Sequence, residues 1–224
     1  MKVNKHNFCI DLFHQSKTIN HPDNVNKQKV AFTGNDLHED RMFHLIESVK
    51  RTQIDGLMLE FGVYSAKTTN GIAETVPKKI VHGFDSFKGL PEDWRISNNL
   101  PLKHKRGYFA VSELPQVRQN VKLWEGWFNE TIPTFKKQYT DNIAFLHIDC
   151  DLYSSTKTIF DELNDQIVKN TLIVFDEFYA WGRKQYPLWY EHEYLACKEW
   201  VEKYDREFEV ISHNHHQQCC IKVL

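Results

Sequence analysis

Short apolar runs of strand length recur along this chain and alternate with segments of helical periodicity. Strands are expected at residues 56–63, 79–84, 121–124, 143–148 and 172–175, and helices at 39–50, 66–75, 112–120, 130–139 and 155–167. Short apolar runs between helical segments are typical of strands that are buried on both faces. The alternation therefore predicts an α/β fold with a doubly wound, mostly parallel sheet covered by helices on both sides.

The N-terminal part of the chain departs from this alternation. Residues 1–40 are polar, contain a turn signal at 34–36 and show no clear strand. We therefore expect an N-terminal helical arm over 1–40, followed by a single domain over 41–224.

The C-terminal part departs from it as well. A helix is expected at 190–203, and strands at 208–211 and 219–224 flank a short polar loop. Two strands joined in this way predict an antiparallel hairpin added to the parallel sheet.

Composition narrows the class of protein. With 224 residues, of which 41% are hydrophobic, the chain can bury a full core. Its net charge of −2, with bases and acids intermingled, argues against a nucleic-acid partner. No run approaches the roughly 18 apolar residues of a membrane span, and no signal peptide is evident. Five irregularly spaced cysteines indicate reduced thiols, so we expect a cytoplasmic protein.

Two of the expected strands end in acidic residues. One leads to Asp149 and Asp151, and the other leads directly to Asp176 and Glu177. Ligands bind at the carboxyl ends of the strands in an open α/β sheet, so these four carboxylates are site candidates. The structural alternatives are that Asp151 caps the following helix and that the other pair forms a solvated turn.

A candidate nucleotide-binding loop follows the first strand. Gly62 occupies the turn into the next helix, where a glycine lets the backbone approach a ligand. Asp85 ends the second strand, at the place where a doubly wound fold puts an acid that binds ribose hydroxyls. A turn glycine and a capping aspartate are the structural alternatives. The sequence lacks the glycine fingerprint of nicotinamide-dependent oxidoreductases, which makes that enzyme class a weaker hypothesis.

Five ordered motifs resemble those of one family. They are Glu60-Phe61-Gly62-Val63-Tyr64, Gly83-Phe84-Asp85-Ser86-Phe87 with the residues up to 92, Gly126-Trp127-Phe128-Asn129-Glu130-Thr131, His147-Ile148-Asp149-Cys150-Asp151-Leu152-Tyr153 and Phe175-Asp176-Glu177. Over roughly residues 40–212 the chain is similar to the macrocin O-methyltransferase (TylF-like) family. These class I S-adenosylmethionine-dependent methyltransferases act on sugar hydroxyls of antibiotics and other glycosides. The resemblance implies a Rossmann-like methyltransferase sheet whose last strand is antiparallel.

The resemblance also implies which residues bind S-adenosylmethionine. Glu60 and Gly62 would open the loop beneath the methionine part, and Asp85 would hold the ribose. The adenine would lie between Glu125 and Gly126. The full implied set is Glu60, Gly62, Tyr64, Thr68, Asp85, Ser86, Glu125, Gly126 and Asp149. One position departs from the family pattern: Ala66 stands where relatives usually have a second glycine, and alanine does not readily adopt a positive φ.

A magnesium site and a general base are implied for the acids. Asp149, Asp176 and Glu177 match the family's Mg²⁺ ligands, although relatives often have aspartate at the last position. Asp151 matches the proposed general base. A sugar hydroxyl is a poor nucleophile, and Mg²⁺ held by carboxylates can orient and acidify it while a base removes its proton. Asp151 lies two residues beyond Asp149, so an extended backbone would point both side chains to the same side.

The predicted function is thus Mg²⁺-assisted O-methylation of a sugar hydroxyl on a glycan or glycoside. The aromatic segment 179–190 and the loop 90–95 could contact this acceptor or form packing and subunit contacts, so a homo-oligomer is left open. The histidines and cysteines between 213 and 220 match none of the usual zinc spacings. The alternative function is a non-catalytic protein of the same fold that binds a glycan or a partner enzyme.

Overall fold

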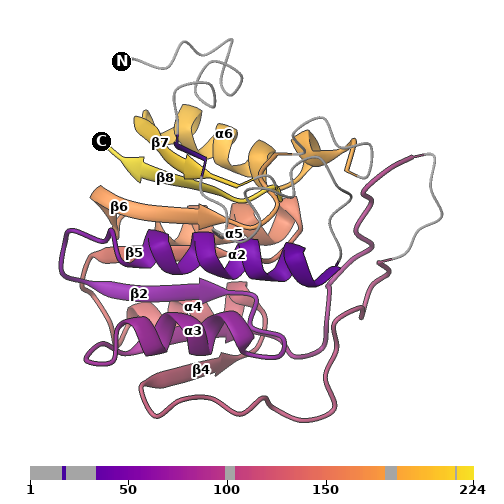
Figure 1. Ribbon diagram of the computed structural model, residues 1–224, viewed down its shortest axis with the longest axis horizontal. Helices are drawn as coiled ribbons and strands as arrows, with labels where there is room; N and C mark the ends of the chain where they lie inside the picture. Colours follow the sequence, from indigo (N-terminus) through magenta and orange to yellow (C-terminus); the bar gives the residue numbers. More distant parts are fainter. Residues whose placement is uncertain (1–16, 19–33, 99–103, 180–185, 215) are drawn as a thin grey trace.

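The structure is a computed structural model that describes residues 17–18, 34–98, 104–179, 186–214 and 216–224. Its described strands form one eight-stranded sheet between two layers of helices (Figure 1). The strands are β1 (Lys17–Thr18), β2 (Leu57–Phe61), β3 (Val81–Asp85), β4 (Val121–Glu125), β5 (Ile143–Ile148), β6 (Ile167–Phe175), β7 (Phe208–His213) and β8 (Cys219–Val223). The helices are α2 (Gly34–Val49), α3 (Lys67–Thr75), α4 (Phe128–Lys136), α5 (Tyr153–Leu163), the 3-10 helix η2 (Trp189–Glu191) and α6 (Glu193–Tyr204).

The strand order is β1-β7-β8-β6-β5-β2-β3-β4. The strands β4, β3, β2, β5 and β6 pair with one another in parallel, in that order. The last strand, β8, lies between β6 and β7 and is antiparallel to both. The predicted doubly wound, Rossmann-like sheet with an antiparallel last strand is therefore confirmed, as is the terminal hairpin.

Alternate side chains of the strands pack against the two helical layers. Helices α2 and α3 cover one face of the sheet, and α4, α5 and α6 cover the other (Figure 1). In β2, Met58 packs in the cluster beneath α2 and α3, whereas Leu59 packs in the cluster that includes α4, α5 and α6. This period of two is what a strand buried on both faces produces. Among the described helices, none combines the length and apolar character needed to cross a membrane.

The register of the parallel strands brings the predicted site residues to one edge of the sheet. Phe61 of β2 pairs with Ile148 of β5, which in turn pairs with Phe175 of β6. The residue that follows each of these three is the glycine or one of the aspartates singled out by the sequence. These residues therefore leave the sheet at the same level, on adjacent strands.

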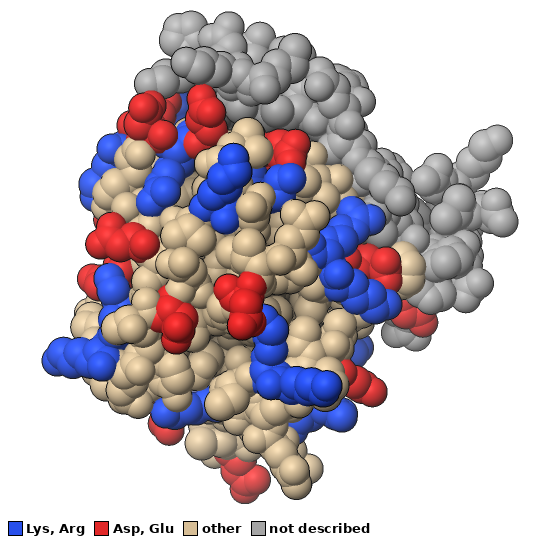
Figure 2. All heavy atoms as spheres, turned by 90° about the vertical axis from the view of Figure 1, so that its left-hand side faces the viewer, with Lys and Arg blue, Asp and Glu red and all other residues tan. Residues whose placement is uncertain are grey.

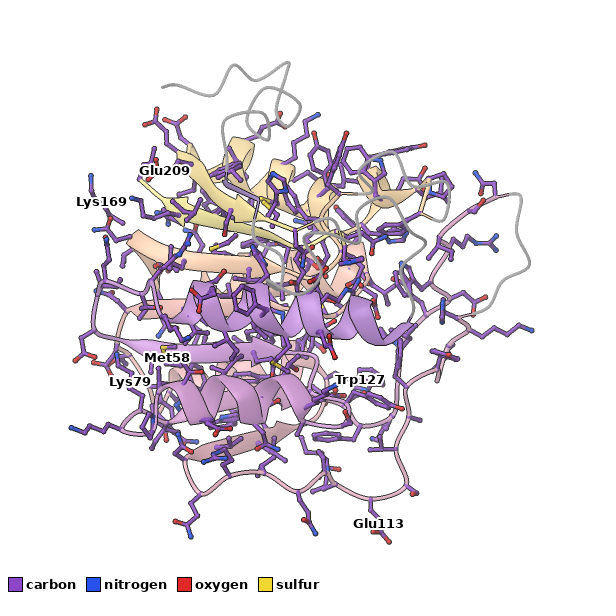
Figure 3. All side chains as sticks on the ribbon, in the orientation of Figure 1. Met58, Lys79, Glu113, Trp127, Lys169 and Glu209 are labelled. Atoms are coloured by element: carbon purple, nitrogen blue, oxygen red, sulfur yellow. The ribbon has the colours of Figure 1, made fainter. Side chains whose placement is uncertain are left out.

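The two ends of the sheet have different surroundings. Trp127 lies on the side toward which the arrows of the parallel strands β2 and β6 point, whereas Lys79, Lys169 and Glu209 lie on the opposite side (Figure 3). That opposite side, seen face-on in Figure 2, carries basic and acidic side chains intermingled. A mixed surface of this kind is typical of ordinary solvated protein surface.

Two of the predicted helices differ from the structure. Helix α2 begins at Gly34, within the segment 34–36 that the sequence predicts as a turn. The segment 112–120 is irregular rather than helical. Pro115 interrupts it because proline lacks an N–H and clashes with a preceding helical turn. The side chain of Asn70 instead bonds to the backbone of this segment at two points.

Two strands also differ from the predictions. Strand β6 begins at Ile167, so the helix predicted for 155–167 ends earlier, at Leu163. The register between β5 and β6 shifts near Asn170, whose φ of 70° interrupts the regular pairing. The prediction of no strand within 1–40 is wrong, since β1 pairs in parallel with β7. Most of the predicted N-terminal arm lies outside the described residues.

Gly62→Ala should destabilise the fold more than alanine at another left-handed glycine. Gly62 has φ +96°, and a Cβ there would lie 1.7 Å from the backbone oxygen of Asp149. Gly107 has φ +82°, but nothing lies within 4 Å of its added Cβ. Alanine would have left-handed strain of about 1–2 kcal/mol at both positions. The clash of the added Cβ with the backbone occurs only at Gly62, so Gly62→Ala should lower the free energy of unfolding by roughly 2 kcal/mol more than Gly107→Ala. Urea unfolding measures the difference, and equal losses would contradict the steric argument.

Candidate functional site

A cavity of about 740 Å³ opens at the carboxyl-terminal edge of the sheet. This volume lies within the range of about 300–1,000 Å³ that is typical of small-molecule sites. Its walls come from the loops after β2, β3, β4, β5 and β6 and from α2. Representative lining residues are Gly62, Asp85, Trp127, Asp149, Asp176 and Arg41.

One wall is the loop between β2 and α3, which Asp85 holds in place. The Asp85 carboxylate accepts hydrogen bonds from the backbone N–H groups of Val63 and Tyr64, each at 2.8 Å, and of Phe87 at 2.7 Å. The predicted cofactor residues that line the cavity are Gly62, Tyr64, Thr68, Asp85, Ser86 and Asp149. The structure therefore brings six of the nine predicted cofactor residues to one cavity.

Ala66, the departure from the family pattern, adopts a left-handed conformation with φ 60°. Its methyl group is fully buried in a cluster with Val63 and Phe87. Left-handed strain costs about 1–2 kcal/mol for an L-residue, and burial of one methyl group offsets about 0.8 kcal/mol of it. No side chain caps α3, whose first residues Lys67 and Thr68 line the cavity. Free amide groups of a helix N-terminus thus border the site.

Two other predicted cofactor residues lie beside the cavity rather than in its lining. Glu125 is exposed at the end of β4, and Gly126 follows it with φ 139°. The cavity wall at this point is formed by Trp127 and Phe128. Glu125 and Gly126 therefore directly precede the residues that line the cavity at this point.

Glu60 is also away from the cavity lining, fully buried within β2. Its carboxylate accepts a hydrogen bond from the hydroxyl of Thr69, and its Oε1 lies 2.9 Å from Nδ1 of His147. The other ring nitrogen, Nε2 of His147, lies 3.9 Å from Oδ1 of Asp176. Burial lowers the pKa of His147, but Asp176 and Glu60 outweigh it and leave this pKa well above its ordinary value. A protonated His147 thus links Glu60 to the acids of the site.

The four predicted acids meet in the cavity. Oxygens of Asp149, Asp151 and Glu177 lie within 4.8 Å of one another, and a second group of potential ligand atoms comes from His147, Asp149 and Asp176. Asp151, Asp176 and Glu177 are buried, and Asp149 is half-buried. Carboxylate oxygens at this spacing are a donor set that suits a hard divalent cation.

The reason predicted for the proximity of Asp149 and Asp151 is wrong. Asp151 has φ 63°, so the backbone between the two acids is not extended. A left-handed aspartate is uncommon, and residues in such conformations concentrate at functional sites. The carboxylates converge because the chain turns back on itself between β5 and α5.

Arg41 of α2 is a site residue that the sequence reasoning missed. Its guanidinium donates from Nη1 to Oδ2 of Asp176, and from Nη2 to Oε1 of Glu177 at 2.7 Å and to Oε1 of Gln217 at 3.0 Å. The remaining oxygen of Asp176, Oδ1, accepts a hydrogen bond from Nε2 of Gln218. Both oxygens of Asp176 are therefore occupied by protein groups.

The acids differ in how easily they lose a proton. Burial alone would raise the pKa of Asp176, but Arg41 and His147 together hold it well below its ordinary value. Burial and repulsion from Asp176 raise the pKa of Asp151 to about 7. The pKa values of Asp149 and Glu177 are raised by burial and by their acidic neighbours. The site therefore holds more carboxylates than its two cations neutralise.

Polar side chains of α2 dock this helix against the β7–β8 hairpin. Nε2 of His216 lies 3.0 Å from Oδ2 of Asp40. His44 contacts Oε1 of Gln218 through Nδ1 and the hydroxyl of Ser212 through Nε2, both at 3.1 Å. Within the described residues, the groups that could hold a metal are the two at the acid cluster, whereas His215 lies outside those residues.

The outer part of the cavity is apolar and aromatic. Leu90, Pro91 and Trp94 line it, and the ring of Trp94 packs edge-on against buried Tyr186 with centroids 5.8 Å apart. At the rim, Phe109 packs against exposed Tyr64, with centroids 5.4 Å apart. The predicted loop 90–95 thus contributes to the cavity, while residues 180–185 of the predicted aromatic segment lie outside the described residues.

The chain is similar to solved methyltransferase structures. It aligns with the O-methyltransferase NovP at a TM-score of 0.61 and 22% identity, over 81% of this chain and 78% of that one. It aligns with CalS11, a calicheamicin methyltransferase, at a TM-score of 0.62 and 21% identity, over 95% and 88% of the two chains. At this identity the likeness shows the methyltransferase fold.

Sequence comparisons are more specific. The chain is 27% identical over 184 residues to demethyldecarbamoylnovobiocin O-methyltransferase of Streptomyces niveus, covering 74% of this chain and 64% of that protein. A second relative, from Streptomyces olivaceus, is 8-demethyl-8-(2,3-dimethoxy-alpha-L-rhamnosyl)-tetracenomycin-C 4'-O-methyltransferase. It is 25% identical to this chain over 158 residues, which cover 62% of this chain and 59% of that protein. The chain thus spans about three fifths of these relatives. The sequence model of the Macrocin-O-methyltransferase (TylF) family matches residues 22–189, so the chain belongs to that family.

Proposed function

We propose that this protein transfers a methyl group from S-adenosylmethionine to a hydroxyl group of a sugar. The observation that carries the proposal is that the glycine loop after β2 and the acid cluster after β5 and β6 line the same cavity. A cofactor on the loop and an acceptor at the acids would therefore share one enclosed space. The Streptomyces olivaceus relative is named as a 4'-O-methyltransferase of a rhamnosyl tetracenomycin C, which supports a sugar hydroxyl as the acceptor.

The loop residues can account for cofactor binding. The uncapped start of α3, with Lys67 beside it, suits the carboxylate of the methionine part. The Asp85 carboxylate lines the cavity and can accept hydrogen bonds from ribose hydroxyls in addition to those from the loop backbone. Trp127 and Phe128 offer an aromatic wall for the adenine. Tyr64, Thr68 and Ser86 complete the proposed cofactor side.

The acid cluster fits Mg²⁺. Oε2 of Glu177 is buried and has no hydrogen-bond partner among the described residues, so it is available as a ligand. The raised pKa values of Asp149 and Glu177 mark a shortage of positive charge that a divalent cation would relieve. Asp149 and Glu177 would hold the ion, with Asp176 beside them. The ion would supply Lewis acidity that orients the acceptor hydroxyl and makes it more acidic.

Asp151 is our candidate for the general base. It is buried, it lines the cavity, and its raised pKa of about 7 suits proton transfer near neutral pH. The acceptor oxygen forms its bond to the methyl carbon as the bond from sulfur to that carbon breaks, and Asp151 takes the hydroxyl proton. The products are the methyl ether and S-adenosylhomocysteine. The apolar wall of Leu90, Pro91 and Trp94 would exclude water and hold the sugar ring.

The compartment that we propose is the cytoplasm. Cys150, Cys197, Cys219 and Cys220 are buried and have free thiols. Free thiols in the core are typical of proteins that fold in a reducing compartment.

Asp85→Ala should weaken the binding of S-adenosylhomocysteine by at least about tenfold. The substitution removes the proposed ribose contact and the acceptor of three loop N–H groups, each of which costs binding energy. Titration calorimetry measures the dissociation constant. The matched control is Asp141→Ala, which changes an exposed aspartate that precedes β5 and does not line the cavity. Lack of cofactor binding by the wild-type protein would favour the alternative function as a non-catalytic binding protein.

Asp151→Asn should abolish methyl transfer and leave the affinities for S-adenosylhomocysteine and Mg²⁺ within about threefold of wild type. Asparagine keeps the size of the side chain but cannot accept the proton. Turnover is measured with a panel of glycosides, and both affinities by calorimetry. Because an Asp151 oxygen lies within reach of those of Asp149 and Glu177, a large loss of Mg²⁺ affinity would make Asp151 a ligand instead.

Removal of divalent cations should lower turnover by at least about a hundredfold, because the acceptor hydroxyl loses its Lewis acid. Chelator treatment followed by Mg²⁺ addition tests this expectation. Glu177→Gln should raise the Mg²⁺ dissociation constant by at least about tenfold, since a neutral amide replaces a charged ligand. Full turnover in the presence of chelator would remove the metal from the proposal but leave methyl transfer by Asp151 standing.

A further inference from the structure

Arg41 forms ion pairs with two acids of the proposed metal site, Asp176 and Glu177. It reaches from α2 across the cavity wall and binds both Asp176 and Glu177. The side chain is 22% exposed, and the two carboxylates are 5% and 7% exposed. An ion pair this well shielded from solvent is far less screened than a surface pair.

The contacts of Arg41 involve only one of the two oxygens of Glu177. Arg41 binds Oε1 of Glu177, while Oε2 of the same carboxylate has no hydrogen-bond partner among the described residues. Glu177 also groups with Asp149 and Asp151, whose oxygens lie within 4.8 Å. Arg41 and a divalent cation could thus bind opposite oxygens of Glu177 at the same time.

The position of Arg41 is fixed by more than its two ion pairs. Its Nη2 also donates to Gln217 on the β7–β8 hairpin. The adjacent residue Asp40 bonds to His216, and His44 one turn later bonds to Gln218. These contacts hold α2 on both sides of Arg41 and so fix the backbone from which the guanidinium reaches the acids.

We propose that Arg41 is a built-in counter-ion of the metal site. It keeps the acid cluster ordered when no metal is bound and, by electrostatic repulsion, limits the affinity of the cluster for a divalent cation. The inference rests on the proposed function, because it assumes that the acids bind Mg²⁺. A fixed positive charge that shares carboxylates with a divalent ion must oppose its binding.

The test measures metal binding and thermal stability, and methyl transfer is assayed separately on the same proteins. Arg41→Met removes the charge at similar size, and Arg41→Lys keeps the charge but loses the fork that spans two carboxylates. Arg106→Met is the matched control, since Arg106 is an exposed arginine that lines the same cavity without an ion pair to the acids. Each purified protein is titrated with Mg²⁺ by calorimetry and melted in chelator and in Mg²⁺.

Arg41→Met should bind Mg²⁺ at least about tenfold more tightly than wild type and melt several degrees lower in chelator, with most of that loss restored by Mg²⁺. Arg41→Lys should keep the wild-type affinity within about threefold but melt lower in chelator, and Arg106→Met should match wild type in both measurements. If Arg41→Met folds only when Mg²⁺ is present, that result also supports the proposal.

Unchanged or weaker Mg²⁺ binding by Arg41→Met would overturn the inference. If Arg41→Lys bound Mg²⁺ as tightly as is expected of Arg41→Met, the inference would also be overturned, because the positive charge would then have no effect on the affinity. If Arg41→Met does not fold, the result for Arg41→Lys decides whether the inference stands. Loss of methyl transfer in every protein, with the shift in Mg²⁺ affinity intact, would refute the proposed function alone. No Mg²⁺ binding by either wild type or Arg41→Met would refute the metal site and the inference together.

Discussion

A buried line of alternating charges connects the sheet to α2 and fixes the candidate site. Glu60 of β2 contacts His147 of β5, His147 faces Asp176 after β6, and Asp176 binds Arg41 of α2. Removing one member would leave another as an uncompensated buried charge, which typically costs about 3–5 kcal/mol. The line therefore constrains the relative positions of three strands and one helix at the edge where the cavity opens.

Backbone contacts connect the β2–α3 loop to the acid cluster. Gly62 lies so close to the carbonyl oxygen of Asp149 that no side chain fits between them. The Asp149 N–H in turn donates to the carbonyl of Phe61, the residue before the glycine, at 2.9 Å. The backbone of the first acid is thus held by the strand that leads into the β2–α3 loop. Both walls of the cavity therefore start from the same pair of adjacent strands.

The sequence predicts the sheet and the acids well because both depend on local patterns. Apolar runs that end in Asp149 and Asp176 give the strands and the place where they end. Arg41 could not be found in this way, because its partners lie 135 and 136 residues away. A weak signal exists: Asp40, His44 and Ser48 recur at four-residue steps beside buried Leu45, so this helix has polar groups on its buried face. Such groups require partners elsewhere in the fold. Strand β1 depends on tertiary contacts in the same way, whereas the irregular segment 112–120 contains a local signal, Pro115, that disfavours a helix.

The resemblance to the family leads to the expectation of aspartate at the position of Glu177, and the contact with Arg41 offers a physical reason for the longer side chain. One oxygen of Glu177 binds the guanidinium at 2.7 Å while the other has no hydrogen-bond partner among the described residues. The additional methylene group lets the carboxylate span the distance between α2 and the acids after β5. A shorter side chain at this position would have to give up either the arginine or the approach to Asp149 and Asp151. The presence of glutamate rather than aspartate at position 177 and the presence of Arg41 on α2 are therefore linked by one hydrogen-bonded ion pair.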